Sequence, residues 1–194
     1  GCTNCYAMKM AKRLEAMGVD KYEGLAKTVN GQAVWTGKVR EDEKSLKTPL
    51  SWKKPRKIFV NSMSDLFHDE VTDKFISKVW EVMASTPHHN YQILTKRPDR
   101  MRDILSGWGD EPLPNVWLGT SVENANGESG SNARPIKEDW IDQIYHQCDE
   151  YRTAFFFKQW GTWGADNKKR SKKANGRTYR GRTWDYMPEH AAPI

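Results

Sequence analysis

Short apolar runs alternate with longer amphipathic segments through the middle of the chain. Three of these runs are KIFVNS (57–62), YQILT (91–95) and VWLGTS (116–121). They are short and rich in β-branched and aromatic residues, which is typical of buried strands. A fourth run, AFFFKQW (154–160), predicts a further strand by the same reasoning.

Helical periodicity fills the segments between these runs. Apolar residues recur at helical spacing in segments 5–17, 71–86, 98–109 and 137–148. Thr72 stands where a helix N-cap is expected, and Pro98 suits a first helical turn. We expect the helix after Pro98 to end at Gly107. The region 19–56 is polar, with an Asn-Gly turn signal at 30–31.

This order of elements predicts an α/β fold. Strands that alternate with helices build βαβ units, which place the strands parallel in one sheet. Four strands are too few for a closed eight-stranded barrel. The sequence therefore predicts a partial (β/α) barrel or an open sheet. We expect the barrel domain at 1–160 and a basic, glycine-rich extension at 161–194.

Composition restricts the class of protein. No run of 18 apolar residues is present, so the sequence predicts no membrane span. Three cysteines are an odd and sparse count, which argues against a disulfide framework and for a reducing compartment. These features predict a cytoplasmic protein.

The positive charge of the chain is very uneven. Lys and Arg number 31 against 25 Asp and Glu, a net charge of +6. Segment 168–182 carries eight basic and no acidic residues, which leaves the rest of the chain at −2 (6 − 8). An exposed basic strip attracts polyanions, of which nucleic acid is the commonest. The candidate phosphate contacts are Lys168, Lys169, Arg170, Lys172 and Lys173.

The alternative for this segment is a solvated loop that aids solubility. In either case we expect it to be mobile when free and to stay outside the core. Tyr179 is its only large apolar side chain, so burial has little to order it with.

Polar residues follow every predicted strand. In parallel α/β folds, ligands bind at the carboxyl ends of the strands. The residues at these ends are Asn61, Ser62, Ser64, Asp65, Thr95, Lys96, Arg97, Ser121, Glu123 and Lys158. Lys158 follows three phenylalanines, and a partly desolvated lysine suits a paired acid or an anionic ligand. Since loop starts are polar in most proteins, each position alone is a weak indication.

The cysteines allow several chemistries. Cys2 and Cys5 form a C-x-x-C pair, which serves redox, zinc and iron–sulfur sites alike. Cys148 lies on the apolar face of its predicted helix and is expected to be a core residue. His88 and His89 follow Pro87 in a loop, where we expect them to be solvated. The residue types alone leave the three chemistries open.

Seven blocks of this sequence resemble the phage-associated three-cysteine-motif proteins, a family without an assigned function. The blocks are GCTNCYAMKMAKRL, PRKIFVNSMSDLFHDEV, ILTKRPDRM, NVWLGTSVEN, GESGSNARP, FFFKQWG and GRTWDYMPE, in order along nearly the whole chain. They are also similar to radical S-adenosylmethionine enzymes of the spore-photoproduct-lyase kind. The family pattern has three cysteines before Tyr-Ala, and Cys2 and Cys5 match the second and third.

The chain departs from this pattern at two places. The first cysteine of the pattern would precede Gly1. The family also has several tens of residues where Asn124 here adjoins Ala125. We expect these residues to be omitted from the given sequence, because NGESGSNARP resumes the pattern without drift.

The resemblance implies a partial (β/α) barrel of the radical S-adenosylmethionine type, which holds a 4Fe–4S cluster and S-adenosylmethionine. Cys2 and Cys5 would ligate the cluster, and Glu128 with Ser129 would contact the methionine amino group. An electron from the cluster would cleave the sulfonium to a 5′-deoxyadenosyl radical that abstracts hydrogen from a substrate. The implied cavity residues are Asn61, Ser62, Thr95, Lys96 and Ser121, with Glu123 and Lys158 as catalytic candidates.

The leading hypothesis is therefore a radical enzyme that modifies or repairs a nucleic-acid base or nucleotide. Such an enzyme needs an electron donor such as flavodoxin or ferredoxin, and a partner protein encoded next to it is compatible with the resemblance. The alternative is a non-catalytic nucleic-acid-binding module in which Cys2 and Cys5 hold zinc. A third hypothesis is an enzyme relic that has lost its cluster.

Overall fold

The structure is a computed structural model that describes residues 6–109, 113–121 and 135–188. The described residues belong to two compact units, one within 5–121 and the other within 122–194. We call the first the sheet unit and the second the aromatic unit, after the cores that they contain. Each is described by itself below.

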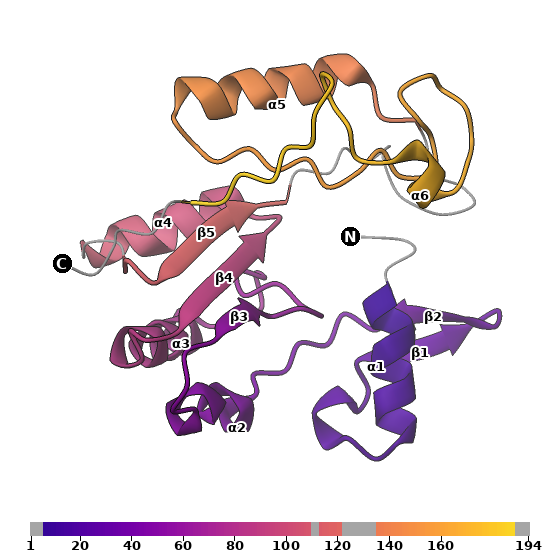
Figure 1. Cartoon of the computed structure of the whole chain (residues 1–194). Coiled ribbons are helices and arrows are strands. Elements are labelled where there is room, and N and C mark those ends of the chain that lie inside the picture. The colour runs from indigo at the N-terminus through magenta and orange to yellow at the C-terminus, as the bar shows by residue number, and fades with distance from the viewer. Residues whose placement is uncertain (1–5, 110–112, 122–134, 189–194) are drawn as a thin grey trace. The chain divides into compact units, whose positions relative to one another are not determined.

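The sheet unit is built around three parallel strands in the order β3-β4-β5 (Figure 1). The pairing sets Ile58 opposite Tyr91, and Ile93 opposite Leu118. Helices α3 and α4 connect the strands, as the alternating pattern predicts. The bounds are β3 Lys57–Val60, α3 Asp73–Ser85, β4 Asn90–Thr95, α4 Pro98–Trp108 and β5 Val116–Thr120.

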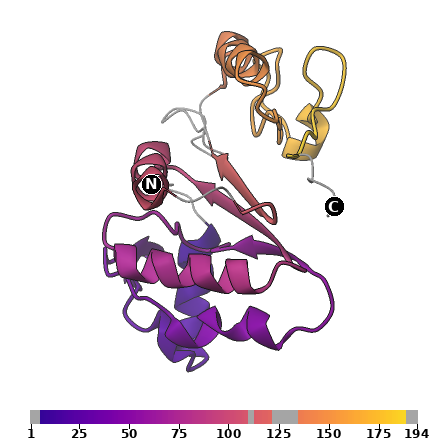
Figure 2. The same ribbon diagram turned by 90° about the vertical axis from the view of Figure 1, so that its left-hand side faces the viewer.

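The core of this unit is mainly aliphatic and lies between the sheet and its helices (Figure 2). Successive strand residues point to opposite faces, so alternate apolar positions pack against α3 and α4. From α3, Ile76, Val79 and Met83 are buried at helical spacing. The buried residues of this core are Leu66, Phe67, Val71, Ile76, Val79, Met83, Tyr91 and Ile93.

The start of α3 and the end of α4 each have an identifiable local cause. The Thr72 hydroxyl accepts a hydrogen bond from the Phe75 amide at 3.2 Å, so the predicted N-cap of α3 is confirmed. Helix α4 continues through Gly107 and ends at Gly109, whose φ of 66° is left-handed. A glycine adopts that conformation at little cost, which makes Gly109 the better terminator.

The N-terminal part of the sheet unit contains α1 and a hairpin. The two strands pair antiparallel across Asn30 and Gly31, which both have positive φ. Two such residues form the turn that matches the twist of hairpin strands, so the turn signal is confirmed. The bounds are α1 Tyr6–Ala16, η1 Asp20–Tyr22, β1 Ala26–Val29, β2 Gln32–Trp35, α2 Glu43–Leu46 and η2 Thr48–Ser51.

The aromatic unit packs one long helix, α5 Glu138–Glu150, and the short α6 Lys172–Asn175 with long irregular segments (Figure 1). Its core is a cluster of ring side chains in edge-to-face or tilted contact, such as Tyr145 with Trp184 at 4.8 Å between ring centroids. The buried members are Ile141, Phe155, Phe157, Trp160, Tyr179 and Trp184. Cys148 packs against them, as expected of a core residue.

The prediction of a partial (β/α) barrel is wrong. Among the described residues, the strands form one three-stranded parallel sheet and a separate two-stranded antiparallel sheet, and neither closes. The parallel strands and the connecting helices were predicted correctly, but the number of βα repeats is too small to curve into a barrel wall.

The predicted fourth strand at 154–160 is also wrong. Its only ladder contact in the described part of the chain is a single antiparallel bridge between Phe156 and Asp185. The segment is extended, with Phe155 and Phe157 buried and Phe156 and Lys158 exposed. Its apolar residues therefore serve the aromatic core rather than a parallel sheet.

The expectation that segment 168–182 stays outside the core is contradicted as well. Tyr179 is only 1% exposed and contacts Tyr145, Phe155, Phe157 and Trp184. One large aromatic side chain is enough to anchor the segment, because a ring of this size buries a large apolar area.

Candidate functional site at the carboxyl edge of the sheet

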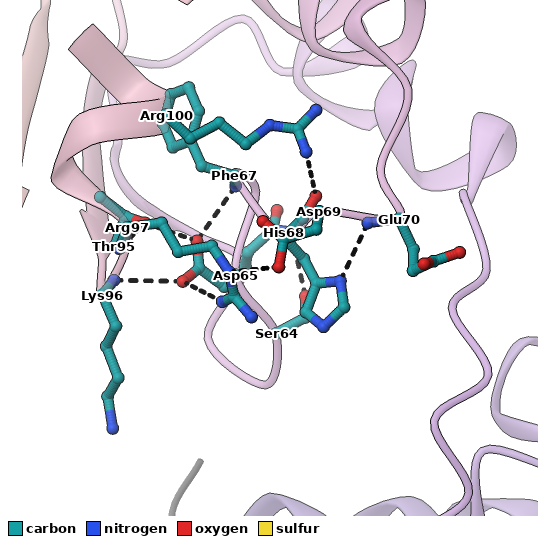
Figure 3. Close-up of polar contacts among 11 residues, drawn as sticks. Ser64, Asp65, Phe67, His68, Asp69, Glu70, Thr95, Lys96, Arg97 and Arg100 are labelled. Carbon is teal, nitrogen blue, oxygen red and sulfur yellow. Dashed lines mark hydrogen bonds and ion pairs between the residues drawn. The ribbon is translucent and has the colours of Figure 1, made fainter. Parts of the chain in front are cut away.

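Asp65 is the centre of a polar network at the carboxyl edge of the parallel sheet (Figure 3). One carboxylate oxygen accepts hydrogen bonds from the Thr95 hydroxyl at 2.7 Å and the Phe67 amide at 3.0 Å. The other accepts from the Lys96 amide at 3.1 Å and the Arg97 guanidinium at 3.2 Å. Asp65 thus joins the loop after β3 to the loop after β4.

The Asp65 carboxylate is fully satisfied by these donors and partly shielded. The Asp65 side chain is 17% exposed and that of Arg97 is 31% exposed, so their ion pair is partly shielded from water. Hydrogen bonds to a charged group are stronger than neutral ones, and four donors leave the carboxylate with no unmet demand. Asp65 therefore positions its neighbours rather than offering a free oxygen to a ligand.

Two arginines at the start of α4 hold the loop that follows Asp65. The Arg97 Nε atom lies 3.4 Å from a carboxylate oxygen of Asp69. Arg100 donates to the carbonyl oxygens of His68 and Val71 at 2.9 and 2.8 Å, and it pairs with Asp73 at 2.8 Å. Since these contacts cross from one βα connection to the next, they hold the two connections together.

The loop directly after β3 is tied to the start of α1. Asn61 has a φ of 57°, a left-handed conformation that asparagine tolerates better than most residues. Its side-chain amide donates to the Ser64 hydroxyl at 3.0 Å. The Tyr6 hydroxyl donates to the Ser62 carbonyl oxygen at 2.7 Å. The first residue of α1 is therefore anchored at the carboxyl edge of the sheet.

The structure brings five of the predicted site residues to this one edge. They are Asn61, Ser62, Thr95, Lys96 and Ser121, which follow or end three adjacent strands. The Ser121 amide donates to the Thr95 carbonyl oxygen at 2.8 Å. Thr95 itself is 1% exposed, and its hydroxyl is engaged by Asp65 and by the Arg97 amide.

The remaining predicted site residues lie elsewhere. Cys2, Cys5, Glu123, Glu128 and Ser129 lie outside the described residues. Lys158 is exposed in the aromatic unit, in a segment that does not join the parallel sheet. The reason for choosing it, a partly desolvated strand end, is therefore wrong.

Sequence reasoning missed the roles of Asp65, Arg97 and Tyr6. Asp65 and Arg97 were visible as polar residues after strands, but their pairing joins positions 32 residues apart and leaves no periodic signal. Tyr6 is 61% exposed, so its position in the helical pattern gave no reason to single it out.

The described residues do not supply a metal site. Within them, no three His, Cys, Asp or Glu side chains gather as a metal ion would require. Burial raises the pKa of the Cys148 thiol, which disfavours the thiolate that binds metal. His89 is fully buried against Trp52 and Tyr91, so the expectation that it is solvated is wrong.

Comparison with known protein families shows the family to which this chain belongs. Residues 1–127 and 125–188 match the family described as "Protein of unknown function (DUF5131)". The chain belongs to this family. The two matched segments overlap at residues 125–127. No curated protein and no solved structure matches the chain.

The basic segment of this DUF5131 chain divides into paired and unpaired charges. Arg170 meets Asp166 at 2.6 and 2.8 Å, Arg177 pairs with Asp185, and Arg180 lies 2.9 Å from Asp142. The hydrogen bonds from Arg170 hold the pKa of Asp166 well below its ordinary range. Arg170 was a predicted phosphate contact, but its charge is already balanced.

Two lysines of this segment remain available. Lys172 and Lys173 are exposed on α6 and have no carboxylate partner within the described ranges. They stay predicted phosphate contacts, together with Lys168 and Lys169. The DUF5131 chain also has, among its described helices, none with the length and apolar character that a membrane span requires.

Proposed function

We propose that this DUF5131 protein is an enzyme of the radical S-adenosylmethionine type that acts on a nucleic-acid base or nucleotide. The carboxyl edge of β3, β4 and β5 would bind S-adenosylmethionine. When both are bound, a 4Fe–4S cluster and S-adenosylmethionine would supply a 5′-deoxyadenosyl radical.

The observation that carries the proposal is the hydrogen bond from Tyr6 to Ser62. Tyr6 directly follows Cys5 in the chain. Its hydroxyl is anchored on the loop after β3, among the residues that the resemblance assigns to the cofactor. A tyrosine that follows a cysteine in the chain and is anchored at a candidate ligand site supports the proposed chemistry.

The edge residues suit the polar parts of S-adenosylmethionine. Ser62 and Ser121 carry hydroxyls, and Asn61 carries an amide that both donates and accepts. The Lys96 side chain extends away from the Asp65 carboxylate, while its backbone amide donates to it (Figure 3). These groups can recognise a carboxylate, an amine and ribose hydroxyls, and the Asp65 network would hold them in place.

The cluster itself finds no ligands in the described part of the chain. Cys148 is a poor candidate because of its buried thiol, so ligation would fall to Cys2 and Cys5. A cluster needs three or four thiolates. Cys2 and Cys5 alone fall short of that number, so the presence of a cluster has to be measured directly.

The test uses the protein purified and reconstituted without oxygen. We expect iron and sulfide in the ratio of a 4Fe–4S cluster, and release of 5′-deoxyadenosine from S-adenosylmethionine after reduction. The double variant C2A/C5A should lose both signals. The matched control C148A removes the third cysteine of the given sequence and should retain them.

The same preparation separates the alternatives. Zinc without iron would favour the non-catalytic nucleic-acid-binding module, and iron that survives C2A/C5A would contradict the proposed ligands. A second test concerns the anchor. Tyr6→Phe should weaken S-adenosylmethionine binding by up to about ten-fold, the worth of one hydrogen bond. Tyr22→Phe is its control, because within the described residues that hydroxyl makes a single weak hydrogen bond, to the Met63 sulfur at 3.9 Å.

A further inference from the structure

A tight turn in the aromatic unit sets the position of Arg182. Tyr179 and Arg182 exchange backbone hydrogen bonds at 2.9 and 3.2 Å. The two residues between them, Arg180 and Gly181, have φ values of 49° and 77°. This is a hairpin-type turn, in which glycine is favoured at one of the two left-handed positions. The turn leaves Tyr179 in the core and leads Arg182 to the surface.

Arg182 stacks on a buried aromatic platform. Its guanidinium carbon lies 3.7 Å from the centroid of the Trp184 ring and 5.7 Å from that of Tyr186. Trp184 is 3% exposed and its indole N–H donates to the Tyr179 carbonyl oxygen at 2.7 Å, so the platform is fixed. A guanidinium held flat against a ring keeps its other face and its N–H edge toward solvent.

Arg182 differs from the other arginines of its segment. Arg170, Arg177 and Arg180 are each paired with an aspartate. The Arg182 guanidinium has no carboxylate and no hydrogen-bond acceptor within residues 6–109, 113–121 and 135–188. A guanidinium with five free donors is the preferred protein group for phosphate oxygens and for base edges.

An exposed aromatic ring lies directly beside it. Tyr186 is 52% exposed and contacts the Trp184 ring edge-on at 5.7 Å. One side of Tyr186 thus rests on the core while its remaining surface faces solvent. Exposed aromatic rings next to a planar cation form the surface on which unpaired bases stack.

We infer that Arg182 and Tyr186 form a binding site for single-stranded nucleic acid. An unpaired base stacks on the exposed face of Tyr186, and the Arg182 N–H groups bind the adjacent phosphate. A duplex cannot use this site, because its bases are already stacked on one another. The inference rests on the proposed function only in taking nucleic acid as the substrate.

The experiment measures the affinity of the full chain for a labelled 12-nucleotide strand and for the duplex of the same sequence, by fluorescence anisotropy. Wild type should bind the single strand more tightly than the duplex. Tyr186→Ala should weaken single-strand binding by about ten-fold, while Tyr186→Phe keeps the ring and should bind like wild type. Because stacking releases no counterions, the loss should be the same at low and high salt.

Two variants of Arg182 test the planar shape of its guanidinium as well as its charge. Arg182→Lys keeps the charge but loses the plane, and it should weaken single-strand binding several-fold. Arg182→Gln should weaken it further and reduce the salt slope by about 0.7, the value for one phosphate contact on a single strand. Arg152→Gln is the matched control: it removes one exposed arginine of the same unit that makes no ring contact or ion pair with other described residues. Circular dichroism of each variant checks the fold.

Three outcomes would overturn the inference. The duplex could bind as tightly as the strand, Tyr186→Ala could bind like wild type, or Arg182→Lys could bind like wild type. None of these depends on the cluster, since cluster content and 5′-deoxyadenosine release are measured separately. A protein that lacks the cluster but passes the stacking tests would refute the proposed chemistry and leave this site intact.

Discussion

The two units of this chain reach a buried core by different routes. In the sheet unit, aliphatic residues such as Ile76, Val79 and Ile93 come from regular helices and strands. In the aromatic unit, the core rings Phe155, Tyr179 and Trp184 come from irregular segments, and α5 is the one helix longer than four residues in its described part. A few large rings bury enough area to order chain that has little backbone ladder.

Charged residues also play different parts in the two units. In the sheet unit, Asp65, Arg97 and Arg100 hold successive βα loops at one edge. In the aromatic unit, arginines lie over the rings and pair with aspartates around them, as Arg180 does with Tyr145 and Asp142. Electrostatic contacts therefore hold loops together at the carboxyl edge of the sheet in one unit and support the core in the other.

The largest expected effect comes from removing the central ring platform. Trp184→Ala deletes a side chain that is 3% exposed and should lower the free energy of unfolding by about 3 to 5 kcal/mol. Hydrogen exchange measured by mass spectrometry should show protection lost within 135–188 and kept in β3, β4 and β5.

The matched variant in the other core is Ile76→Ala, with a residue that is 0% exposed. It should show the reverse pattern of protection. If either variant removes protection from both units, the two cores are not independent and the comparison fails.

The second prediction concerns the polar edge of the sheet unit. Asp65→Asn keeps the shape but replaces one carboxylate oxygen with an NH2 group. That group then faces either the donors Thr95 and Phe67 or the donors Lys96 and Arg97, and the change should cost about 2 kcal/mol. S-adenosylmethionine binding should fall with it. Thermal and urea unfolding measure the first effect, and calorimetric titration the second.

Asp69→Asn is the control for this edge. Its carboxylate also contacts Arg97, at 3.4 Å, but is 72% exposed. Exposed ion pairs contribute little, so the change should cost less than about 0.5 kcal/mol. Equal losses in the two variants would mean that Asp65 has no special role at the edge.

Sequence periodicity predicts one unit far better than the other, for a physical reason. In the sheet unit, α3 and α4 were predicted from apolar residues at helical spacing, and β3, β4 and β5 from short runs rich in β-branched and aromatic residues. The aromatic core depends on single residues far apart in the chain, such as Phe155 and Trp184, which form no period. For that reason, segment 154–160 was mistaken for a sheet strand.

The candidate site likewise contains residues that local sequence predicted and one contact that it did not. Position after a strand predicted that Asn61, Ser62, Lys96 and Ser121 would meet, because parallel strands bring their carboxyl ends to one edge. Nothing local predicted that Tyr6 reaches Ser62, since a contact between residues 56 positions apart depends on how α1 is placed.

A smaller effect should appear in the pH dependence of the aromatic unit. The hydrogen bond from the Tyr179 hydroxyl, followed by the charge of Arg180, lowers the pKa of Asp142. A carboxyl with a lowered folded pKa stabilises the fold above its unfolded pKa and loses that contribution as the pH falls below about 4. Burial, followed by Asp142, raises the pKa of Tyr179, so its contribution is lost as the pH rises above about 10.

Tyr179→Phe tests the expected loss of stability at acid pH and at alkaline pH at once. Wild type should be more stable than the variant near pH 7, and the difference should narrow below about pH 4 and above about pH 10. Urea midpoints across this range measure it. A difference that stays constant with pH would show that the hydroxyl matters only through packing.

The smallest effect contrasts two helix caps. The Thr72 hydroxyl caps the 13-residue α3, and the Ser171 hydroxyl caps the four-residue α6, each accepting from a backbone amide at 3.2 Å. A cap matters in proportion to the structure that frays without it. Helix α3 packs three buried residues on the core, whereas α6 buries none. Thr72→Ala should therefore cost about 1 kcal/mol, and Ser171→Ala less than about 0.5 kcal/mol.

Thr72→Ser and Ser171→Thr keep the acceptors and should be near neutral, which separates capping from the loss of side-chain bulk. If Ser171→Ala proved as costly as Thr72→Ala, α6 would be an integral part of the aromatic unit, and the view that rings rather than backbone order that unit would be wrong.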